Sequence, residues 1–324
     1  SDSSQLVVVY GRRRVGKTFL INEYFNYKFA FKLTGVYGEK RKIQLRNFAL
    51  ELNRRSGVKQ EDPKDWTEAF SYLRSYMESL DSSVKQVVFL DELPWLDSKR
   101  SGFLSAFEYF WNDYASTKHN FIFVLCGSAT SWMDEKITKN KGGLFNRQTC
   151  RLYLEPFTLN ETEKFLDKKG INWSRYEIAE CYMIMGGIPY YLDLLDSELS
   201  LKQNIDNLFF RKKGELWDEF EHLYKTLFTN SGNYVAVVEA LSEERGGLTR
   251  NEICKKINSS DGGDLSKVLN NLVLSGFLSV SNIYGRKKKE CLYQLSDYYT
   301  LFYFKFIKDY YGKDEHYWSN SIDN

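Results

Sequence analysis

The sequence contains few of the residues from which metal centres and disulfide frameworks are built. Among its 324 residues there are only 3 histidines, which argues against a histidine-built metal centre. The 5 cysteines are odd in number and scattered, and no two of them form a C-x-x-C pair. This pattern argues against a zinc site and against a disulfide framework. We therefore expect reduced thiols and a cytoplasmic location.

Long apolar runs and an excess of one charge are also missing. No stretch approaches the roughly 20 apolar residues that cross a bilayer, so no membrane partner is expected. The formal net charge is only +2, so any contact with nucleic acid must come from a local basic patch. With 43% hydrophobic and 27% charged residues, the composition is that of a soluble protein with a substantial core.

The sequence does contain a complete G-x-x-x-x-G-K-S/T pattern near its beginning. An apolar run over residues 6–10 precedes the pattern and a helical pattern follows it, which is the strand-to-helix setting of a phosphate-binding loop. In such a loop the backbone N–H groups and the lysine hold phosphates, and the last hydroxyl ligates Mg²⁺. We therefore predict binding of a nucleoside triphosphate by Gly11, Arg12, Arg13, Arg14, Val15, Gly16, Lys17, Thr18 and Phe19.

Continuous apolar runs alternate with amphipathic helices through the first half of the chain. Uninterrupted apolar strands separated by helices are typical of a parallel sheet covered on both faces, an α/β fold. The strand-like runs are 29–36, 86–90 and 121–125, and the helical patterns are 45–52, 66–73 and 107–114. After about residue 155 the strand pattern stops, and a capping box at Thr158 and Glu161 opens a helical region.

Two carboxylates, Asp91 and Glu92, follow the strand-like run 86–90. Ligands of parallel sheets lie at the carboxyl ends of the strands, so we expect both side chains beside the phosphate loop. Asp91 is placed to hold Mg²⁺, directly or through water, and Glu92 to orient and activate the attacking water. After the next strand, the hydroxyl of Ser128 is expected to hydrogen-bond the γ-phosphate or the lytic water. The alternative is a helix N-cap by Ser128 or Thr130.

Residues 232–296 predict a winged helix-turn-helix. Helices are expected at 234–241, at 251–257 after a Thr249–Glu252 capping box, and after a cap at Asp264, followed by strands at 277–280 and 291–295. Two functions remain open for it: largely sequence-blind binding of double-stranded DNA, or service as a protein-docking or autoinhibitory module. The basic residues of this region that could contact phosphates are Arg250, Lys255, Lys256, Lys267, Arg286, Lys287, Lys288 and Lys289.

The order of these motifs resembles the archaeal-type P-loop ATPase family, which is similar to the AAA and STAND branches. The resemblance rests on residues 10–18, 89–92, 127–128, 145–147 and 186–192. It implies an AAA/RecA-like P-loop sheet of strand order 5-1-4-3-2 with a helical lid and a C-terminal winged helix. The implied parts are an ATPase core over 1–155, a lid over 156–231 and the winged helix over 232–296. Residues 297–324 are rich in aromatic residues, and we expect them to form a helix that packs onto the winged helix, followed by a tail.

The resemblance also implies residue roles. Lys17, Glu92, Ser128 and Arg147 would be catalytic, and Thr18 and Asp91 would hold the metal. Arg147 lies where such ATPases place an arginine that completes the γ-phosphate site, in the same or a neighbouring subunit; the alternative is a surface arginine. The turn 186–189, which ends at Pro189, resembles the segment near adenine; the alternative is an ordinary corner between helices. The three loop arginines either brace phosphates or an adjacent protomer, or are solvated.

The function favoured by these patterns is an ATP-binding, Mg²⁺-dependent ATP-hydrolysing switch. It would couple the nucleotide state to a winged helix that contacts DNA, a protein or another copy of the chain. One alternative is a nucleotide-dependent DNA-binding or regulatory protein with negligible turnover, and another is a small-molecule phosphotransferase. We also expect the N-terminal segment with which related ATPases cover adenine to be missing, because Ser1 lies just before the first strand.

Overall fold

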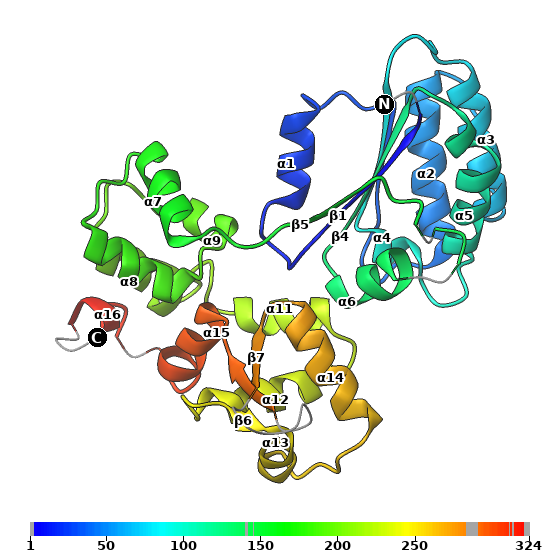
Figure 1. Cartoon of the computed structure of the whole chain (residues 1–324). Coiled ribbons are helices and arrows are strands. Elements are labelled where there is room, and N and C mark those ends of the chain that lie inside the picture. Colours follow the sequence, from blue (N-terminus) through cyan, green and yellow to red (C-terminus); the bar gives the residue numbers. More distant parts are fainter. Residues whose placement is uncertain are drawn as a thin grey trace. The chain divides into compact units, whose positions relative to one another are not determined.

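The computed structural model describes residues 3–139, 142–144, 146–282, 291–310, 312 and 314–320 (Figure 1). The chain forms two compact units. The first consists of Ser1–Gly11 and Gly16–Leu154, and the second of Arg12–Val15 and Glu155–Asn324. The middle of the phosphate-loop pattern thus clusters with the second unit, whereas both of its ends belong to the first. The division into four parts stays a prediction.

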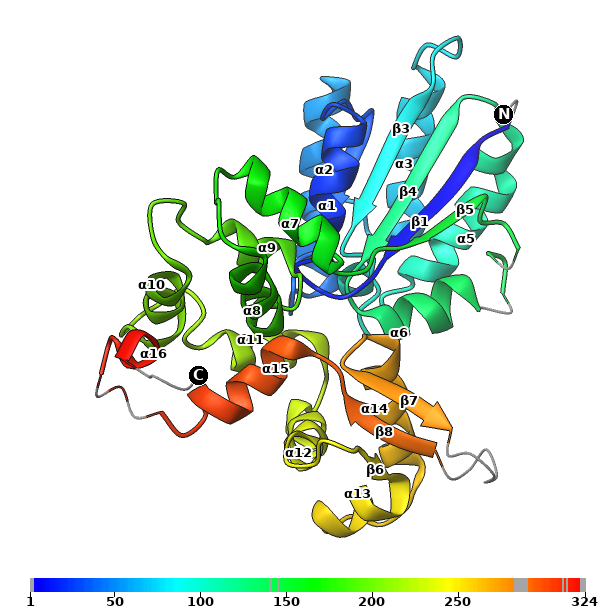
Figure 2. The ribbon, with the colours of Figure 1, turned by 60° about the vertical axis from the view of Figure 1, so that its left-hand side comes forward.

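The first unit is a five-stranded parallel sheet of order β2-β3-β4-β1-β5. This order confirms the expected 5-1-4-3-2, and Figure 2 shows β3, β4, β1 and β5 side by side. The strands are β1 (Gln5–Tyr10), β2 (Phe31–Thr34), β3 (Gln86–Asp91), β4 (Phe121–Gly127) and β5 (Cys150–Tyr153). The longer helices are α1 (Lys17–Tyr24), α2 (Arg41–Ser56), α3 (Trp66–Glu78) and α5 (Phe103–Asp113), with single turns α4 (Leu93–Leu96) and α6 (Thr130–Met133).

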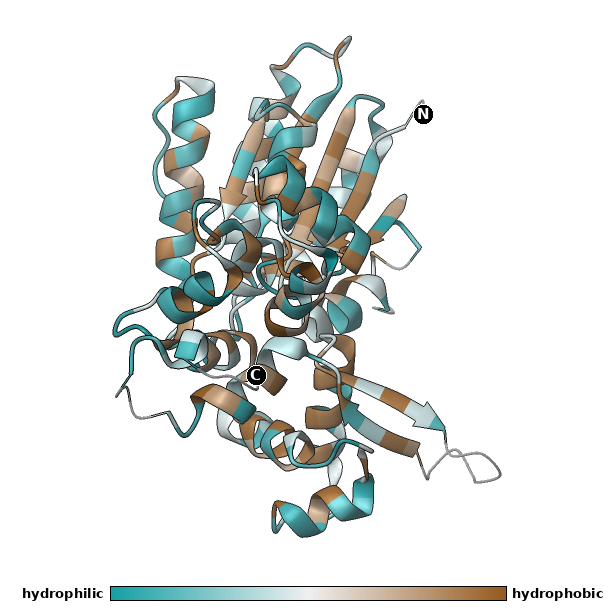
Figure 3. Ribbon diagram, turned by 90° about the vertical axis from the view of Figure 1, so that its left-hand side faces the viewer, coloured by the Kyte–Doolittle hydropathy of each residue, from teal (hydrophilic) through white to brown (hydrophobic). Residues whose placement is uncertain are grey.

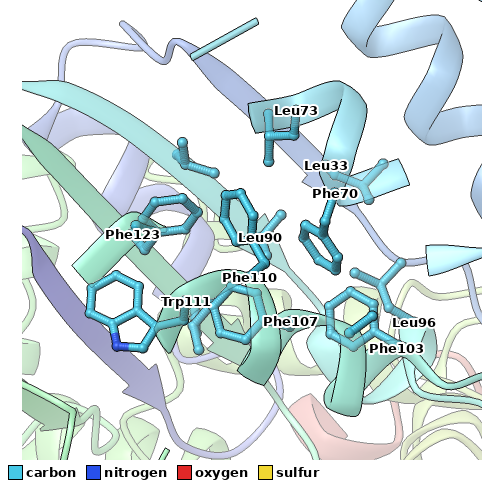
Figure 4. Close-up of a cluster of buried hydrophobic side chains, with 14 of the residues drawn as sticks. Leu33, Phe70, Leu73, Leu90, Leu96, Phe103, Phe107, Phe110, Trp111 and Phe123 are labelled. Atoms are coloured by element: carbon cyan, nitrogen blue, oxygen red, sulfur yellow. The ribbon is translucent and has the colours of Figure 1, made fainter. Parts of the chain in front are cut away.

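Helices lie on both faces of this sheet, α1 on one face and α2, α3 and α5 on the other (Figure 1). Successive strand residues point to opposite faces, so an unbroken apolar run supplies two cores at once. Leu90 and Phe123 face the larger core, where Phe70 of α3 stacks on Phe110 of α5 with ring centroids 5.1 Å apart (Figure 4). Phe89 and its neighbours pack with α1 on the opposite face. The strands are accordingly mostly brown in Figure 3, whereas the helices are striped.

The second unit begins with helices. Thr158 and Glu161 form the predicted capping box at the start of α7. The helices of this part are α7 (Leu159–Lys168), α8 (Arg175–Met185), α9 (Pro189–Asp193), α10 (Leu201–Ile205), the π-helical turn η3 (Asp206–Phe210) and α11 (Glu219–Leu227). Gly187 has a φ of +64°, and a Cβ there would come within 2.1 Å of the Phe157 carbonyl oxygen. Glycine is therefore required at this corner.

Three helices and a small antiparallel sheet of order β6-β8-β7 follow. The helices are α12 (Ser231–Ser242), α13 (Arg250–Lys256) and α14 (Gly263–Leu274), and the strands are β6 (Leu248–Thr249), β7 (Leu278–Asn282) and β8 (Cys291–Leu295). The Thr249–Glu252 capping box is confirmed. The predicted cap at Asp264 is wrong: the N-cap of α14 is Gly262, and Asp264 lies in the first helical turn. Sequence analysis also missed β6, which is too short to show a pattern.

The aromatic segment after residue 297 is helical at its start, where α15 (Tyr298–Phe302) continues directly into the π-helical turn η4 (Tyr303–Ile307). The short helix α16 (Tyr317–Asn320) follows. The rings of this segment pack mainly in the region predicted as the lid, because Tyr299 lies 5.0 Å from Tyr191 and Phe302 lies 5.2 Å from Phe209, measured between centroids. The terminal segment therefore joins the lid region to the small sheet, and does not only cover the latter.

All five cysteines are free thiols, as expected from their spacing. In the part of the chain that the structure describes, no helix combines the length and the apolar character that crossing a bilayer requires.

Candidate nucleotide-binding site

The phosphate-loop pattern connects the end of β1 to the start of α1. Gly16, the N-cap residue of α1, has a left-handed φ of +86° and leaves the first turn without a side-chain cap. Gly11 has a φ of +149°, and a Cβ there would come within 2.2 Å of the Leu154 carbonyl oxygen. Lys17 is buried, and its Nζ donates to the Gly11 carbonyl at 3.0 Å. The amide groups of a helix start and an ammonium group thus converge on one loop, an arrangement that favours anions.

Thr18, the next residue of the loop, is hydrogen-bonded to the end of strand β3. The hydroxyl group of Thr18 donates to Asp91 Oδ2 at 2.7 Å. Asp91 is the last residue of β3 and is only 3% exposed. Its other oxygen accepts the backbone N–H of Glu92 at 2.9 Å. The predicted metal residues Thr18 and Asp91 are therefore in direct contact.

Glu92 has an unusual backbone conformation. Its φ is +48° and its ψ is 49°, a left-handed conformation that costs on the order of 1–3 kcal/mol for a residue with a side chain. Gly35 makes room for this turn, because a Cβ at Gly35 would come within 2.6 Å of the Glu92 carbonyl oxygen. The turn is followed at once by Pro94 in the first turn of α4. Such strain is characteristic of residues whose position matters for function.

The carboxylate of Glu92 is held by Ser128 at the end of β4. Ser128 donates its hydroxyl to Oε1 at 2.7 Å and its backbone N–H to Oε2 at 3.3 Å. The N-cap alternative is wrong, because the N-cap residue of α6 is Ala129. The burial of Cys126, with the nearby Asp91 carboxylate as a second cause, raises the pKa of the Cys126 thiol well above its usual value. This thiol is therefore neutral.

Residues 1–195 match the family described as an ATPase domain predominantly from Archaea. This match covers more than half of the chain. The chain belongs to this archaeal-type P-loop ATPase family.

The full chain is also similar to individual proteins. It is 26% identical over 309 residues to an uncharacterized protein of Methanocaldococcus jannaschii, covering 95% of this chain and 65% of that protein. The chain thus spans just under two thirds of the length of this relative. Among solved structures, the Walker-type ATPase of Pyrococcus abyssi matches with a TM-score of 0.64 at 18% identity, over 93% of this chain and 91% of that one. The ORC2 protein of Aeropyrum pernix, solved as ADPNP–ADP complexes, matches with a TM-score of 0.52 at 13% identity, over 91% and 84%.

The structure brings five of the predicted site residues together in the first unit. They are Lys17, Thr18, Asp91, Glu92 and Ser128. Arg147 is exposed, in the segment between Leu144 and β5, and Phe19 on α1 is 66% exposed. Their proposed roles stay predictions, as does the role of Pro189, the first residue of α9.

The three arginines of the loop are not simply solvated. Arg12 is 4% exposed, and its Nη1 donates to Asp297 Oδ1 at 2.5 Å. Arg14 pairs with Glu219 at 2.7 Å, and Arg13 is half-buried. Sequence analysis missed both carboxylates. Asp297 carries a local signal as the N-cap of α15, but no sequence pattern announces a partner 285 positions away.

The basic residues near the small sheet are partly neutralised. Arg250 pairs with Asp261 and also donates to the Ser266 hydroxyl. Lys256 pairs with both Glu243 and Glu244. Lys255 and Lys267 are exposed, whereas the predicted basic run 286–289 lies outside the described residues. Among the described basic positions of the predicted footprint, Lys255 and Lys267 are exposed and stand outside the ion pairs that hold Arg250 and Lys256.

Proposed function

We propose that this chain binds ATP with Mg²⁺ and hydrolyses it, and that its second unit carries a winged helix-turn-helix that responds to the nucleotide. The observation that supports hydrolysis is the continuous hydrogen-bonded series from Thr18 through Asp91 and Glu92 to Ser128. It joins the phosphate loop to the carboxyl ends of β3 and β4 in one unit. A protein that only senses nucleotide needs the loop, but it has no use for a second, strained acid.

The donor set fits a hard divalent cation. The Thr18 hydroxyl and the Asp91 carboxylate are adjacent oxygen donors, and such ligands suit Mg²⁺. In the described residues there is no cluster of three or more His, Cys, Asp or Glu side chains that could hold a metal by itself. The ion would therefore arrive with the triphosphate, and Thr18 and Asp91 would hold it. When bound, Mg²⁺ would neutralise the charge that develops on the transferred phosphoryl group.

The chain's own groups then have separate tasks. The amides around Gly16 and the ammonium of Lys17 bind and orient the phosphates. Glu92 accepts a hydrogen bond from the attacking water and aligns it with the γ-phosphorus. Ser128 fixes the Glu92 carboxylate by two hydrogen bonds, so that little reorganisation is needed when the water is bound.

In the second unit, α12, α13 and α14 with the sheet β6-β8-β7 support the winged helix proposal. Its partner is either a DNA duplex, held by the phosphate backbone, or a protein. The pairing of Arg250 and Lys256 with acids lowers the positive charge that the described residues offer to DNA. The lysines Lys255 and Lys267 remain to test a DNA partner.

The test is a comparison of wild type with Glu92→Gln. Wild type should bind ATP, release phosphate and lose turnover when EDTA removes Mg²⁺. Glu92→Gln should bind ATP with similar affinity and lose about 10²–10⁴-fold in kcat. Lys17→Ala should lose binding itself. Equal turnover in wild type and Glu92→Gln would show that the acid does not activate water, and absence of ATP binding by wild type would sink the proposal.

A further inference from the structure

The middle of the phosphate loop is held by residues far away in the sequence. Residues Arg12–Val15 cluster with Glu155–Asn324, whereas Gly11 and Gly16 cluster with the sheet. The loop is thus covalently part of the first unit at both ends and packed into the second unit in the middle. A displacement of residues 12–15 together with the second unit would be taken up by the backbone at Gly11 and Gly16.

Arg12 lies at a buried acidic site, where its partner is Asp297. Its guanidinium group is 4% exposed, donates to Asp297 Oδ1 at 2.5 Å and lies 4.7 Å above the centre of the Phe277 ring. Asp297 is 3% exposed. A buried ion pair with an aromatic wall is far less screened than a surface pair, so its two members are strongly coupled.

Asp297 also begins a helix. Its second oxygen, Oδ2, accepts the backbone N–H of Thr300 at 3.0 Å and the hydroxyl of the same residue at 2.6 Å. One oxygen of the Asp297 carboxylate thus binds Arg12, and the other caps the first turn of α15. A displacement of Arg12 acts on the cap of α15 directly.

Arg14 repeats this arrangement at a second acidic site, where its partner is Glu219. Its guanidinium pairs with Glu219 Oε2 at 2.7 Å and lies 4.1 Å above the centre of the Tyr190 ring. Glu219 is 3% exposed, and its Oε1 accepts the Tyr191 hydroxyl at 2.8 Å. The carbonyl group of Arg14 accepts the Tyr190 backbone N–H at 3.4 Å. This second acidic site therefore joins the loop to the starts of α9 and α11.

We propose that Arg12 and Arg14 are positioning residues that clasp the phosphate loop to α15 and α11, so that triphosphate binding and the state of the second unit control one another. This inference rests on the proposed function. The guanidinium groups are committed to Asp297 and Glu219, which leaves the backbone amides and Lys17 for the phosphates. Coupling of this kind is reciprocal: a partner that shifts α15 changes the affinity for ATP by the factor by which ATP changes the affinity for that partner.

The experiment is hydrogen exchange of the full chain with and without Mg·ATP, combined with nucleotide titration. In wild type, ATP should slow exchange in residues 11–18 and also change exchange in α15. Asp297→Asn keeps an acceptor for the helix cap but removes the charge that holds Arg12. It should weaken ATP binding by on the order of tenfold and abolish the response of α15. Arg12→Met with Asp297→Asn should lose no more than the worse single variant, because both remove one interaction.

Lys308→Met is the matched control. It breaks an exposed ion pair with Glu239 in the same terminal segment, outside the clasp, and should leave both the ATP affinity and the α15 response unchanged. If Asp297→Asn does not fold, Arg14→Met replaces it in the test. It should weaken ATP binding and abolish the change that ATP causes in hydrogen exchange of α11. A purely structural role would lower stability but leave the exchange response to ATP intact.

The outcomes separate the two proposals. Absence of any ATP effect at residues 11–18 in wild type would overturn the proposed function, and the inference with it. Protection of residues 11–18 without a change in α15, or a wild-type response that persists in both Asp297→Asn and Arg14→Met, would overturn the inference alone.

Discussion

Ser128 donates a hydrogen bond to each oxygen of the Glu92 carboxylate, one from its hydroxyl at 2.7 Å and the other from its backbone N–H at 3.3 Å. The two residues follow neighbouring parallel strands, because β3 pairs with β4. The group proposed to activate water and the residue proposed as a sensor therefore form a single structural element. The position of one cannot change without the other.

Ser128→Ala removes the stronger of these two hydrogen bonds and leaves the backbone bond in place. Glu92 should then sample more orientations, and we expect kcat to fall by about 10- to 100-fold with little change in the affinity for ATP. Steady-state phosphate release and an equilibrium ATP titration measure the two quantities. Ser128→Thr, which keeps a hydroxyl, is the control. A Ser128→Ala variant with normal kcat would show that the backbone bond suffices.

Thr18→Val removes the hydroxyl that contacts Asp91 and would ligate Mg²⁺. We expect this variant to need a higher Mg²⁺ concentration for half-maximal turnover, because one oxygen ligand is lost. Thr18→Ser retains the hydroxyl and should titrate as wild type does. The measurement is ATP turnover against Mg²⁺ concentration. Superimposable curves for Val and Ser would rule out Thr18 as a metal ligand.

Gly187→Ala should destabilise the protein more than Gly170→Ala. Both glycines have positive φ values, +64° and +78°, so alanine at either position costs roughly 1–2 kcal/mol of backbone strain. Only at Gly187 would the added Cβ also meet a carbonyl oxygen at 2.1 Å, whereas nothing lies within 4 Å of a Cβ at Gly170. The clash should add about 1–3 kcal/mol to the loss in unfolding free energy. Urea denaturation of the two variants measures the difference, and equal losses would contradict the packing seen at Gly187.

Burial raises the pKa of Glu219 above 4.5, and the nearby Arg14 only partly opposes this rise. A carboxyl whose pKa is higher in the folded state binds its proton more tightly there than in the unfolded chain. Its contribution to the free energy of unfolding therefore grows as pH falls from the raised value toward 4.5. We expect the stability of wild type relative to Glu219→Gln to increase over this interval. Denaturation of both proteins at several pH values tests the sign, and a difference that shrinks on acidification would contradict it.

If DNA is the partner, Lys267→Ala should weaken binding more than Lys256→Ala. Lys256 is already paired with Glu243 and Glu244, whereas Lys267 on α14 is exposed. Loss of one phosphate contact should lower the slope of log affinity against log salt concentration by about one. Duplex binding at several salt concentrations measures this slope. The opposite ranking, or no binding by wild type, would favour a protein partner for the proposed winged helix.

Local patterns predicted much of the fold. The runs that became β3 and β4 were visible because buried parallel strands are apolar on both faces, and the Thr158 and Thr249 capping boxes formed as their spacing indicated. The failures have local causes too. Asp264 has the chemistry of a cap, but the helix begins one residue earlier. The edge strand β5 is largely exposed and lacks an apolar run, so only the family resemblance implied its place.

The sequence by itself determined that the chain has a phosphate loop and, after another strand, the two acids Asp91 and Glu92, because each of these motifs is made of neighbouring residues. Only the tertiary structure decided that Ser128 holds Glu92. It also decided that Arg12 pairs with Asp297 and that Arg14 pairs with Glu219. These pairs join positions far apart in the chain. Such positions meet only after the apolar faces have packed, and a buried charge then requires a partner that no local pattern can specify.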